Sequence, residues 1–224
     1  MNFNVEKNVI DLGINVAIVV IKGMNNCEEN QDFIGYRDSN LNDIKCNFTE
    51  ETIMNDTVLK GFWKLHERVG KTSKHDIPSP ENLMNMLLKN GYLPNINLIV
   101  DIYNLVSVMT RLALGAHDLD NIKGNVSLRL TNGSETFLPI GYSKNKSISR
   151  GEYAYIDDTN DVLCRMEVRQ VEKTKVTEST SDCMYIIQGN ENVDNEQIQK
   201  AVDMLVELTL KYCGGHAEIV YKQY

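Results

Sequence analysis

The chain of 224 residues lacks the features that mark several large classes of protein. No apolar run approaches the ~18–20 residues that span a bilayer, so we expect no membrane partner. The opening residues, MNFNVEKNVI, lack a basic region followed by an apolar one, which argues against a secretory signal. The five cysteines are scattered without CxxC spacing, which argues against structural zinc and a disulfide framework. We therefore expect a cytoplasmic protein with reduced cysteines, no metal and no other cofactor.

Local catalytic signatures are also missing. The sequence has no GxSxG, no GxGxxG and no Walker loop, so serine hydrolases and nucleotide-binding enzymes of those types gain no support. Two His-Asp pairs, His75-Asp76 and His117-Asp118, are typical of metal phosphohydrolases only when they stand on helices. The first is followed by Ile-Pro-Ser-Pro, and the second lies between a glycine and a strand-like pattern. The pairs therefore favour no metal centre.

Acidic residues outnumber basic ones in the chain as a whole, but the charges are unevenly distributed. The net charge of −8 weakens any proposal of strong, non-specific nucleic-acid binding. Residues 123–150, however, contain five basic residues and only Glu135 as an acid, and residues 61–75 contain four basic residues and only Glu67. Either a local basic face on an acidic protein or a chance cluster of solvated charges would account for this.

The apolar patterns predict strands and helices without regular alternation, which favours a single α+β domain over residues 1–224. Apolar residues at every second position over 10–20 predict a strand. Asn132-Gly133 predicts the turn of a hairpin, and residues 157–161 predict a second one. Further elements are predicted as helices over 50–69, 80–90 and 98–112, a strand over 183–188, a helix that begins after Asp194 and ends at Gly214, and a closing strand.

Two polar clusters are candidate sites. The stretch LGAHDLD, residues 114–120, is interpreted as a turn in which Asp118 or Asp120 caps backbone N–H groups, or as part of a site that does chemistry. Residues 164–180 carry too many charges for a core segment. As an alternating strand they would place Arg165, Glu167 and Arg169 on one face, either lining a pocket or exposed at a sheet edge.

Taken together, the order and spacing of these segments resemble a known family. The series runs through a helix with Asp101, Asn104, Val106 and Ser107, then LGAHDLD, Gly124, PIG at 139–141, GEY at 151–153, CR at 164–165, RQ at 169–170 and TKVT at 174–177. It is similar to the B3/B4 domain, the editing module of bacterial phenylalanyl-tRNA synthetase β subunits, and closer still to freestanding B3/B4 proteins. The similarity is strongest over 98–188 and weaker over 60–97, and the termini match only in general layout.

The resemblance implies a compact α+β fold with a mostly antiparallel, β-sandwich-like core and flanking helices. It also implies a pocket for the 3′-aminoacyl adenosine of a mischarged tRNA, whose ester is hydrolysed by a positioned water without a protein nucleophile. The implied partners are tRNA and an aminoacyl-tRNA synthetase. Such catalysis depends on orientation and on donors directed at the developing oxyanion.

Carried over position by position, the resemblance implies catalytic roles for Asn104 and Glu172. The synthetase module has a histidine at the position of Gly115, and here His117 takes the place of that module's aromatic residue. The role of the family histidine is therefore lost, taken over by His117, or not needed in freestanding members, and His117 is counted as the third expected catalytic residue. The residues expected to bind the substrate are Asp118, Arg165, Arg169, Gln170, Thr174 and Lys175.

Two other functions remain open at this stage. The acidic charge and the missing histidine are equally compatible with a non-catalytic protein that binds a free amino acid or a nucleotide-like ligand. A purely structural relative is the third alternative. Amino-acid specificity, the preferred tRNA and the oligomeric state are not determined by the sequence.

Overall fold

The structure is a computed structural model that describes residues 1–223. Within these residues the helices are α1 (Lys7–Ile10), α2 (Gln31–Asn47), α3 (Glu50–Asn55), α4 (Thr57–Arg68), α5 (Ser79–Asn90), α6 (Leu98–Thr110), the 3₁₀ turn η1 (Leu119–Asn121) and α7 (Asn195–Cys213). The strands are β1 (Phe3–Val5), β2 (Val16–Lys22), β3 (Ala113–Asp118), β4 (Val126–Leu130), β5 (Tyr153–Asp157), β6 (Val162–Arg165), β7 (Arg169–Gln170), β8 (Cys183–Gln188) and β9 (His216–Gln223).

The described strands form two sheets. One has the order β1-β4-β5-β6-β7 and the other β3-β8-β2-β9. Every pairing is antiparallel except that of β1 with β4. The fold class expected from the sequence, α+β with a mostly antiparallel sandwich and flanking helices, is therefore confirmed.

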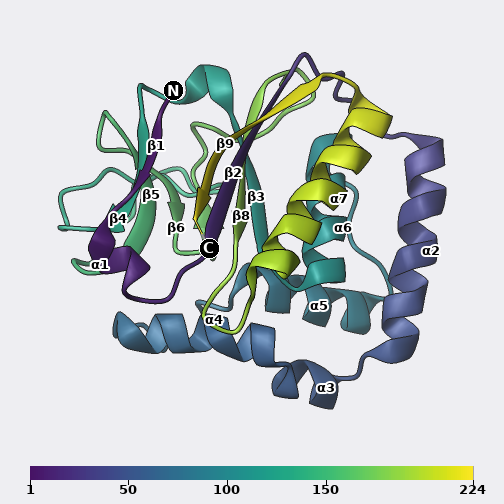
Figure 1. Cartoon of the computed structure of the whole chain (residues 1–224), viewed down its shortest axis with the longest axis horizontal. Helices are drawn as coiled ribbons and strands as arrows, with labels where there is room; N and C mark the ends of the chain where they lie inside the picture. Colours follow the sequence, from purple (N-terminus) through teal and green to yellow (C-terminus); the bar gives the residue numbers. More distant parts are fainter. Residues whose placement is uncertain (224) are drawn as a thin grey trace.

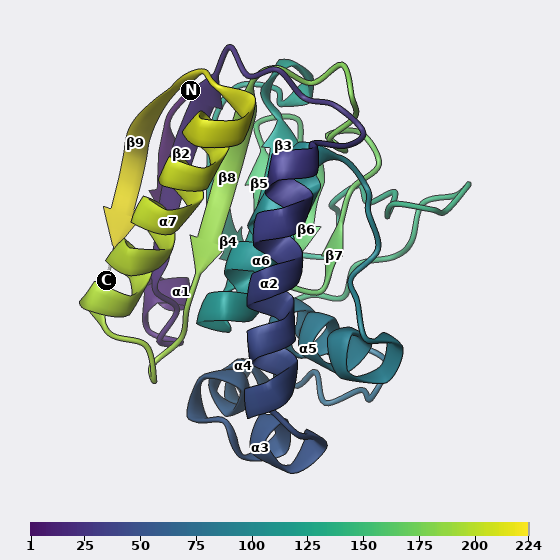
Figure 2. The ribbon, with the colours of Figure 1, turned by 90° about the vertical axis from the view of Figure 1, so that its right-hand side faces the viewer.

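The layers follow from which faces are apolar. The β1-β4-β5-β6-β7 sheet lies on one face of the β3-β8-β2-β9 sheet, and α6 and α7 cover the other face, with α2 outside them (Figures 1 and 2). Because β8 is buried along its whole length and β2 everywhere except at Lys22, these strands lie between two apolar layers. Phe3 of β1 stacks on Tyr155 of β5 and meets Tyr221 of β9 edge-on, which joins the two sheets.

Several local predictions are confirmed because the capping residues act as their types predict. Helix α5 ends where Gly91 adopts a left-handed conformation (φ 82°). Helix α7 begins with a capping box, in which Asp194 and Gln197 each accept the backbone N–H of the other. The hairpin of β5 and β6, strands β8 and β9, and helix α6 also occur where they were predicted.

Two boundary predictions were wrong. The helix predicted over 50–69 is two helices, α3 and α4, because Asp56 between them is extended and its carboxylate accepts the N–H groups of Val58 and Leu59. The strand predicted over 10–20 begins only at Val16. Residues 7–10 are helical and Gly13 turns the chain with φ 84°.

Two turn predictions were also wrong. Asn132-Gly133 does turn, but the chain does not return along β4, which pairs with β5 instead. The Glu135 carboxylate accepts the N–H groups of both turn residues and closes a separate loop. Most of LGAHDLD is strand β3, paired with β8, and the turn begins only at Asp118, whose carboxylate accepts the N–H of Asp120.

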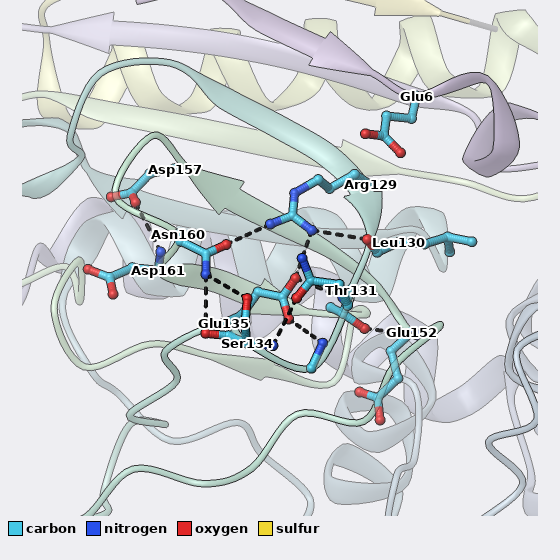
Figure 3. Close-up of polar contacts among 12 residues, drawn as sticks. Glu6, Arg129, Leu130, Thr131, Ser134, Glu135, Glu152, Asp157, Asn160 and Asp161 are labelled. Atoms are coloured by element: carbon cyan, nitrogen blue, oxygen red, sulfur yellow. Dashed lines mark hydrogen bonds and ion pairs between the residues drawn. The ribbon is translucent and has the colours of Figure 1, made fainter.

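The segment between β4 and β5, residues 131–152, is anchored at its base by polar contacts (Figure 3). The Arg129 guanidinium donates to Glu135 and to the Asn160 side chain, each at 2.7 Å. Asn160 in turn donates to the backbone of Ser134. Thr131 and Glu152 exchange hydrogen bonds at the point where the segment returns to β5. The segment is therefore a fixed extension of the sheet at its base.

Among residues 1–223, no helix has both the length and the apolar character needed to cross a membrane.

Candidate functional site

A cavity of about 310 Å³ opens where the edge strands of the two sheets, β3 and β7, approach each other. Helices α5 and α6 close one side of it, and β5, β8 and the turn between β6 and β7 form its floor. Apolar side chains such as Leu83, Leu114 and Ile186 line most of its wall, with polar groups converging at a few points. This combination is typical of small-molecule sites.

Several polar side chains that line the cavity have no hydrogen bond or ion pair to any other residue within 1–223. Among them are Asn104 on α6 and Arg169 and Gln170 on β7. Asn104 and Gln170 are half-buried, and a half-buried amide normally finds a partner. Two amides and one guanidinium are therefore available to a ligand. All three were singled out from the sequence, and the structure brings them together.

Gly115 on β3 allows Gln170 to reach across the cavity. A Cβ atom at position 115 would lie 2.3 Å from the Gln170 side-chain nitrogen, far inside contact distance. The resemblance places the family histidine at position 115. In the present chain, the Gln170 amide occupies the space that a side chain at this position would fill.

The floor of the cavity is a buried hydrogen-bond network around Glu167. Its carboxylate accepts the hydroxyl of Tyr153 at 2.5 Å and the amide of Gln188 at 3.1 Å, and it contacts His66 Nε2 at 2.5 Å. The Tyr155 hydroxyl donates to the Gln188 oxygen at 2.6 Å. Burial raises the pKa of both tyrosines well above the usual value, so they remain hydroxyl donors at neutral pH.

Glu167 reaches the floor because the chain reverses sharply between β6 and β7. Arg165 pairs with Arg169 across the turn, and Met166 adopts a left-handed conformation, with φ 51°. Such a φ is uncommon for a residue other than glycine and persists where the surroundings impose it. The sequence-based expectation of one continuous strand with Arg165, Glu167 and Arg169 on a common face was therefore wrong.

His117 and Thr174 lie outside the cavity, packed against each other. His117 is 1% exposed, and its Nδ1 is 2.7 Å from the Thr174 hydroxyl. Burial lowers the pKa of His117 to about 4, so the ring is neutral at physiological pH. Asp118 accepts a hydrogen bond from the Thr180 hydroxyl in addition to capping η1. The cavity lining contains none of these three predicted residues.

The other predicted residues are engaged in ion pairs. Arg165 is held by Asp76 and Glu152, with side-chain exposure of only 15%. Glu172 and Lys175 pair with each other on the surface at 2.6 Å, and Glu172 also accepts the N–H of Gly141. The hydrogen bond from Lys175 lowers the pKa of Glu172. Of the three residues given catalytic roles by the resemblance, only Asn104 lines the cavity.

Sequence reasoning missed the residues that form the floor and one wall. Glu167 was noted only as a member of a polar segment, and Tyr155, Gln188, Ser79 and Asn82 were not singled out. No local signal marks them, because they come from four separate parts of the chain, namely α5, β5, the turn between β6 and β7, and β8, and only the tertiary packing brings them together. Among residues 1–223, no group of three or more His, Cys, Asp or Glu side chains is placed to hold a metal ion.

The comparisons with known proteins agree on one family. A family model described as the B3/4 domain matches residues 64–214. The phenylalanine–tRNA ligase β subunit of Mycoplasma genitalium is 28% identical over 99 residues, which cover 44% of this chain and 12% of that protein. An N-terminal fragment of the phenylalanyl-tRNA synthetase β subunit from Pyrococcus horikoshii superposes with a TM-score of 0.51 and 15% identity, covering 96% of this chain and 50% of the fragment.

The two relatives differ in what they support. At 15% identity the Pyrococcus fragment supports the fold alone. The chain spans about an eighth of the curated ligase subunit that it matches and half of the solved fragment. The activities of those larger proteins therefore do not transfer directly to this chain.

Proposed function

This chain belongs to the B3/4 domain family, and from that premise we propose that it hydrolyses the ester bond of mischarged aminoacyl-tRNA, acting in trans on the tRNA. The observation that carries the proposal is a set of polar side chains without a hydrogen bond or ion pair to another described residue, Asn104, Gln170 and Arg169, around one partly apolar cavity. An amide in a ligand-sized cavity without a protein partner can donate a hydrogen bond to a ligand oxygen.

The arrangement suits ester hydrolysis by a positioned water. The amide groups of Asn104 on α6 and Gln170 on β7 belong to side chains that line the cavity, and they can donate to the ester carbonyl as negative charge develops on its oxygen. The apolar wall receives the amino-acid side chain. The Glu167 carboxylate at the floor can accept hydrogen bonds from the substrate's ammonium group in addition to its present donors.

The chemistry of the lining also favours water over a protein nucleophile. Cys164 is the one cysteine among the residues that line the cavity, and burial raises its pKa, so it stays a thiol at neutral pH. Its Sγ donates to the Met166 carbonyl oxygen at 3.0 Å, so the thiol hydrogen is already engaged. A covalent acyl-cysteine step therefore gains no support.

A deacylation assay tests the proposal. The protein is incubated with a panel of tRNAs, each charged with a cognate or non-cognate amino acid, and release of the labelled amino acid is followed. We expect release above the buffer rate for at least one mischarged tRNA. Asn104→Ala should lower the rate at least about a hundredfold, the low end for loss of an oxyanion donor. The matched control is Asn85→Ala, which changes an exposed asparagine on α5 outside the cavity. Buffer-rate release from every tRNA would exclude the proposal.

A second candidate is a protein that binds a free amino acid without catalysis. The cavity volume is at the low end of the ~300–1,000 Å³ found for ligand pockets. It also offers a carboxylate at Glu167 and a guanidinium at Arg169, which complement the ammonium and carboxylate of an amino acid. Calorimetric titration with the twenty amino acids separates the two functions. Tight binding without deacylation would favour this candidate.

A further inference from the structure

The geometry points to an RNA 3′-end platform at the mouth of the cavity, in which Tyr142 and Arg169 stack the terminal nucleoside while the basic loop 141–150 contacts the preceding phosphates. This inference rests on the proposed function and extends it to a surface outside the cavity. Tyr142 and the basic loop lie on the segment between β4 and β5, which extends past β7 in Figure 2, and Arg169 lies on β7 itself.

The size of the cavity places the nucleoside outside. A cavity of about 310 Å³ can hold an amino-acid moiety, but an aminoacyl group together with a base and ribose is considerably larger. An ester bond located between Asn104 and Gln170 would leave the nucleoside at the rim. The rim on the β7 side is formed by Ile140 and Arg169, both of which line the cavity.

Beside that rim is an exposed aromatic ring with cations around it. Tyr142 is 40% exposed, the Arg169 guanidinium carbon is 5.7 Å from its ring centroid, and Lys146 Nζ is 4.6 Å away. Lys146 is itself exposed, so its flexible side chain can be displaced by an incoming base. Aromatic rings and guanidinium planes are the two surfaces on which proteins stack unpaired bases.

The backbone holds this ring in place. Ile140 donates its N–H to the Gln170 carbonyl at 3.0 Å, and Glu172 donates its N–H to Leu138, so the rim segment runs along β7. The Gly141 N–H binds the Glu172 carboxylate at 3.1 Å. The base of the segment is fixed by the Arg129 network of Figure 3. Pre-organisation of this kind lowers the entropic cost of binding.

The charge around the ring matches a phosphate chain. Lys144, Lys146 and Arg150 are exposed, and none of them forms an ion pair with another described residue. No acidic residue occurs between Glu135 and Glu152. On a protein of net charge −8, this loop is a local positive patch that adjoins the cavity.

The test is a thermodynamic cycle that compares two RNA hairpins, neither of them aminoacylated, and two forms of the protein. The probe is a 5′-fluorescein acceptor-stem hairpin that ends in CCA, compared with the same hairpin lacking the terminal adenosine, and anisotropy measures the Kd at low salt. We expect wild type to bind the intact hairpin about tenfold more tightly than the shortened one. Tyr142→Ala should bind both with the weaker Kd, because the adenosine has lost its stacking surface. Tyr142→Phe should behave as wild type.

The control variant is Tyr92→Ala, which removes another exposed tyrosine (62% exposed) that does not line the cavity. It should leave both Kd values unchanged. Lys144→Gln combined with Lys146→Gln should reduce the salt dependence of binding. The slope of log Kd against log salt should fall by about 0.7–0.9 for each phosphate that the variant no longer neutralises.

Three results would overturn the inference. They are absence of binding by wild type at low salt, equal Kd values of wild type and Tyr142→Ala for the intact hairpin, and an equal loss for both hairpins in that variant. The proposed function fails separately. If the cycle holds but no amino acid is released in the deacylation assay, the platform stands and the hydrolase does not. If amino acid is released but Tyr142→Ala binds the two hairpins as wild type does, the hydrolase is supported and the platform is excluded.

Discussion

Acidification should destabilise this protein through His117, a residue that the sequence had suggested as catalytic. Its ring is 1% exposed, and its Nε2 has no hydrogen-bond partner among the described residues. Burial lowers the pKa of His117 to about 4, against about 6.5 for an exposed histidine. The unfolded chain therefore binds a proton between about pH 6.5 and pH 4 that the folded chain does not bind, and the free energy of unfolding falls as the pH is lowered through this range.

The magnitude follows from the two pKa values. Linkage between them gives a loss of about 2 kcal/mol in the free energy of unfolding from about pH 7.5 to about pH 5. Other groups titrate over the same range, so the quantity to measure is a difference between two proteins. His117→Gln cannot gain the proton, and its loss of stability over this range should be smaller than that of wild type by that amount.

Urea unfolding at several pH values, followed by circular dichroism, measures this difference. Any fixed cost of replacing His117 cancels, because only the change with pH is compared. If wild type and His117→Gln lose the same stability between about pH 7.5 and about pH 5, the ring is not a buried neutral group. The separation of His117 from the solvent-accessible cavity would then be refuted.

Three further predictions concern close packing and thiol access. Gly115→Ala should displace the Gln170 amide and lower ligand binding or deacylation at least about tenfold. The loss of stability should be smaller than the about 1–3 kcal/mol of an overpacked core, because the displaced atom is at the end of a flexible side chain. Unchanged activity would contradict this prediction. Gly61→Ala in α4 should destabilise by about 1–3 kcal/mol in urea unfolding, although alanine favours helices, since its Cβ would lie 2.0 Å from the buried Asn190 side chain; a stabilised variant would argue against this packing. A thiol reagent should modify exposed Cys46 first, and Cys46→Ser should remove that fast phase. The three buried thiols should react only when the protein unfolds, because burial raises their pKa values; they are Cys164, Cys183 and Cys213.

The sequence did not predict every element or boundary, and helix α2 shows one reason. Helix α2 has a weak apolar stripe, in which Phe33, Arg37 and Leu41 are the buried residues, so helical periodicity is barely visible. Arg37 is buried because its guanidinium faces Asp101 on α6 at 3.7 Å, and burial raises the pKa of that carboxyl to about 6. A charged residue on the inner face hides the pattern from any local reading.

The residues of the candidate site also fall into those that the sequence predicted and those that it did not. Asn104 was predicted from the family resemblance, and Arg169 and Gln170 from the polar segment 164–180 together with that resemblance; the structure places all three at one cavity. Glu167 was not, because the turn that aims it inward has a left-handed Met166 in place of the glycine or asparagine that would announce it. The inward position of Glu167 depends on partners from β5 and β8, which lie far away in the sequence.

By itself, then, the sequence determined the elements with strong local codes: caps such as Asp194 and Gly91, helical stripes, and the order of motifs that marks the family. Those features depend on interactions within a few residues, which a sequence displays directly. Only the tertiary structure decided which polar groups face the cavity and which are used up in pairs, such as Arg165 with Glu152. That choice depends on the register of β3 on β8 and on the packing of two sheets, which sum weak contacts between distant residues.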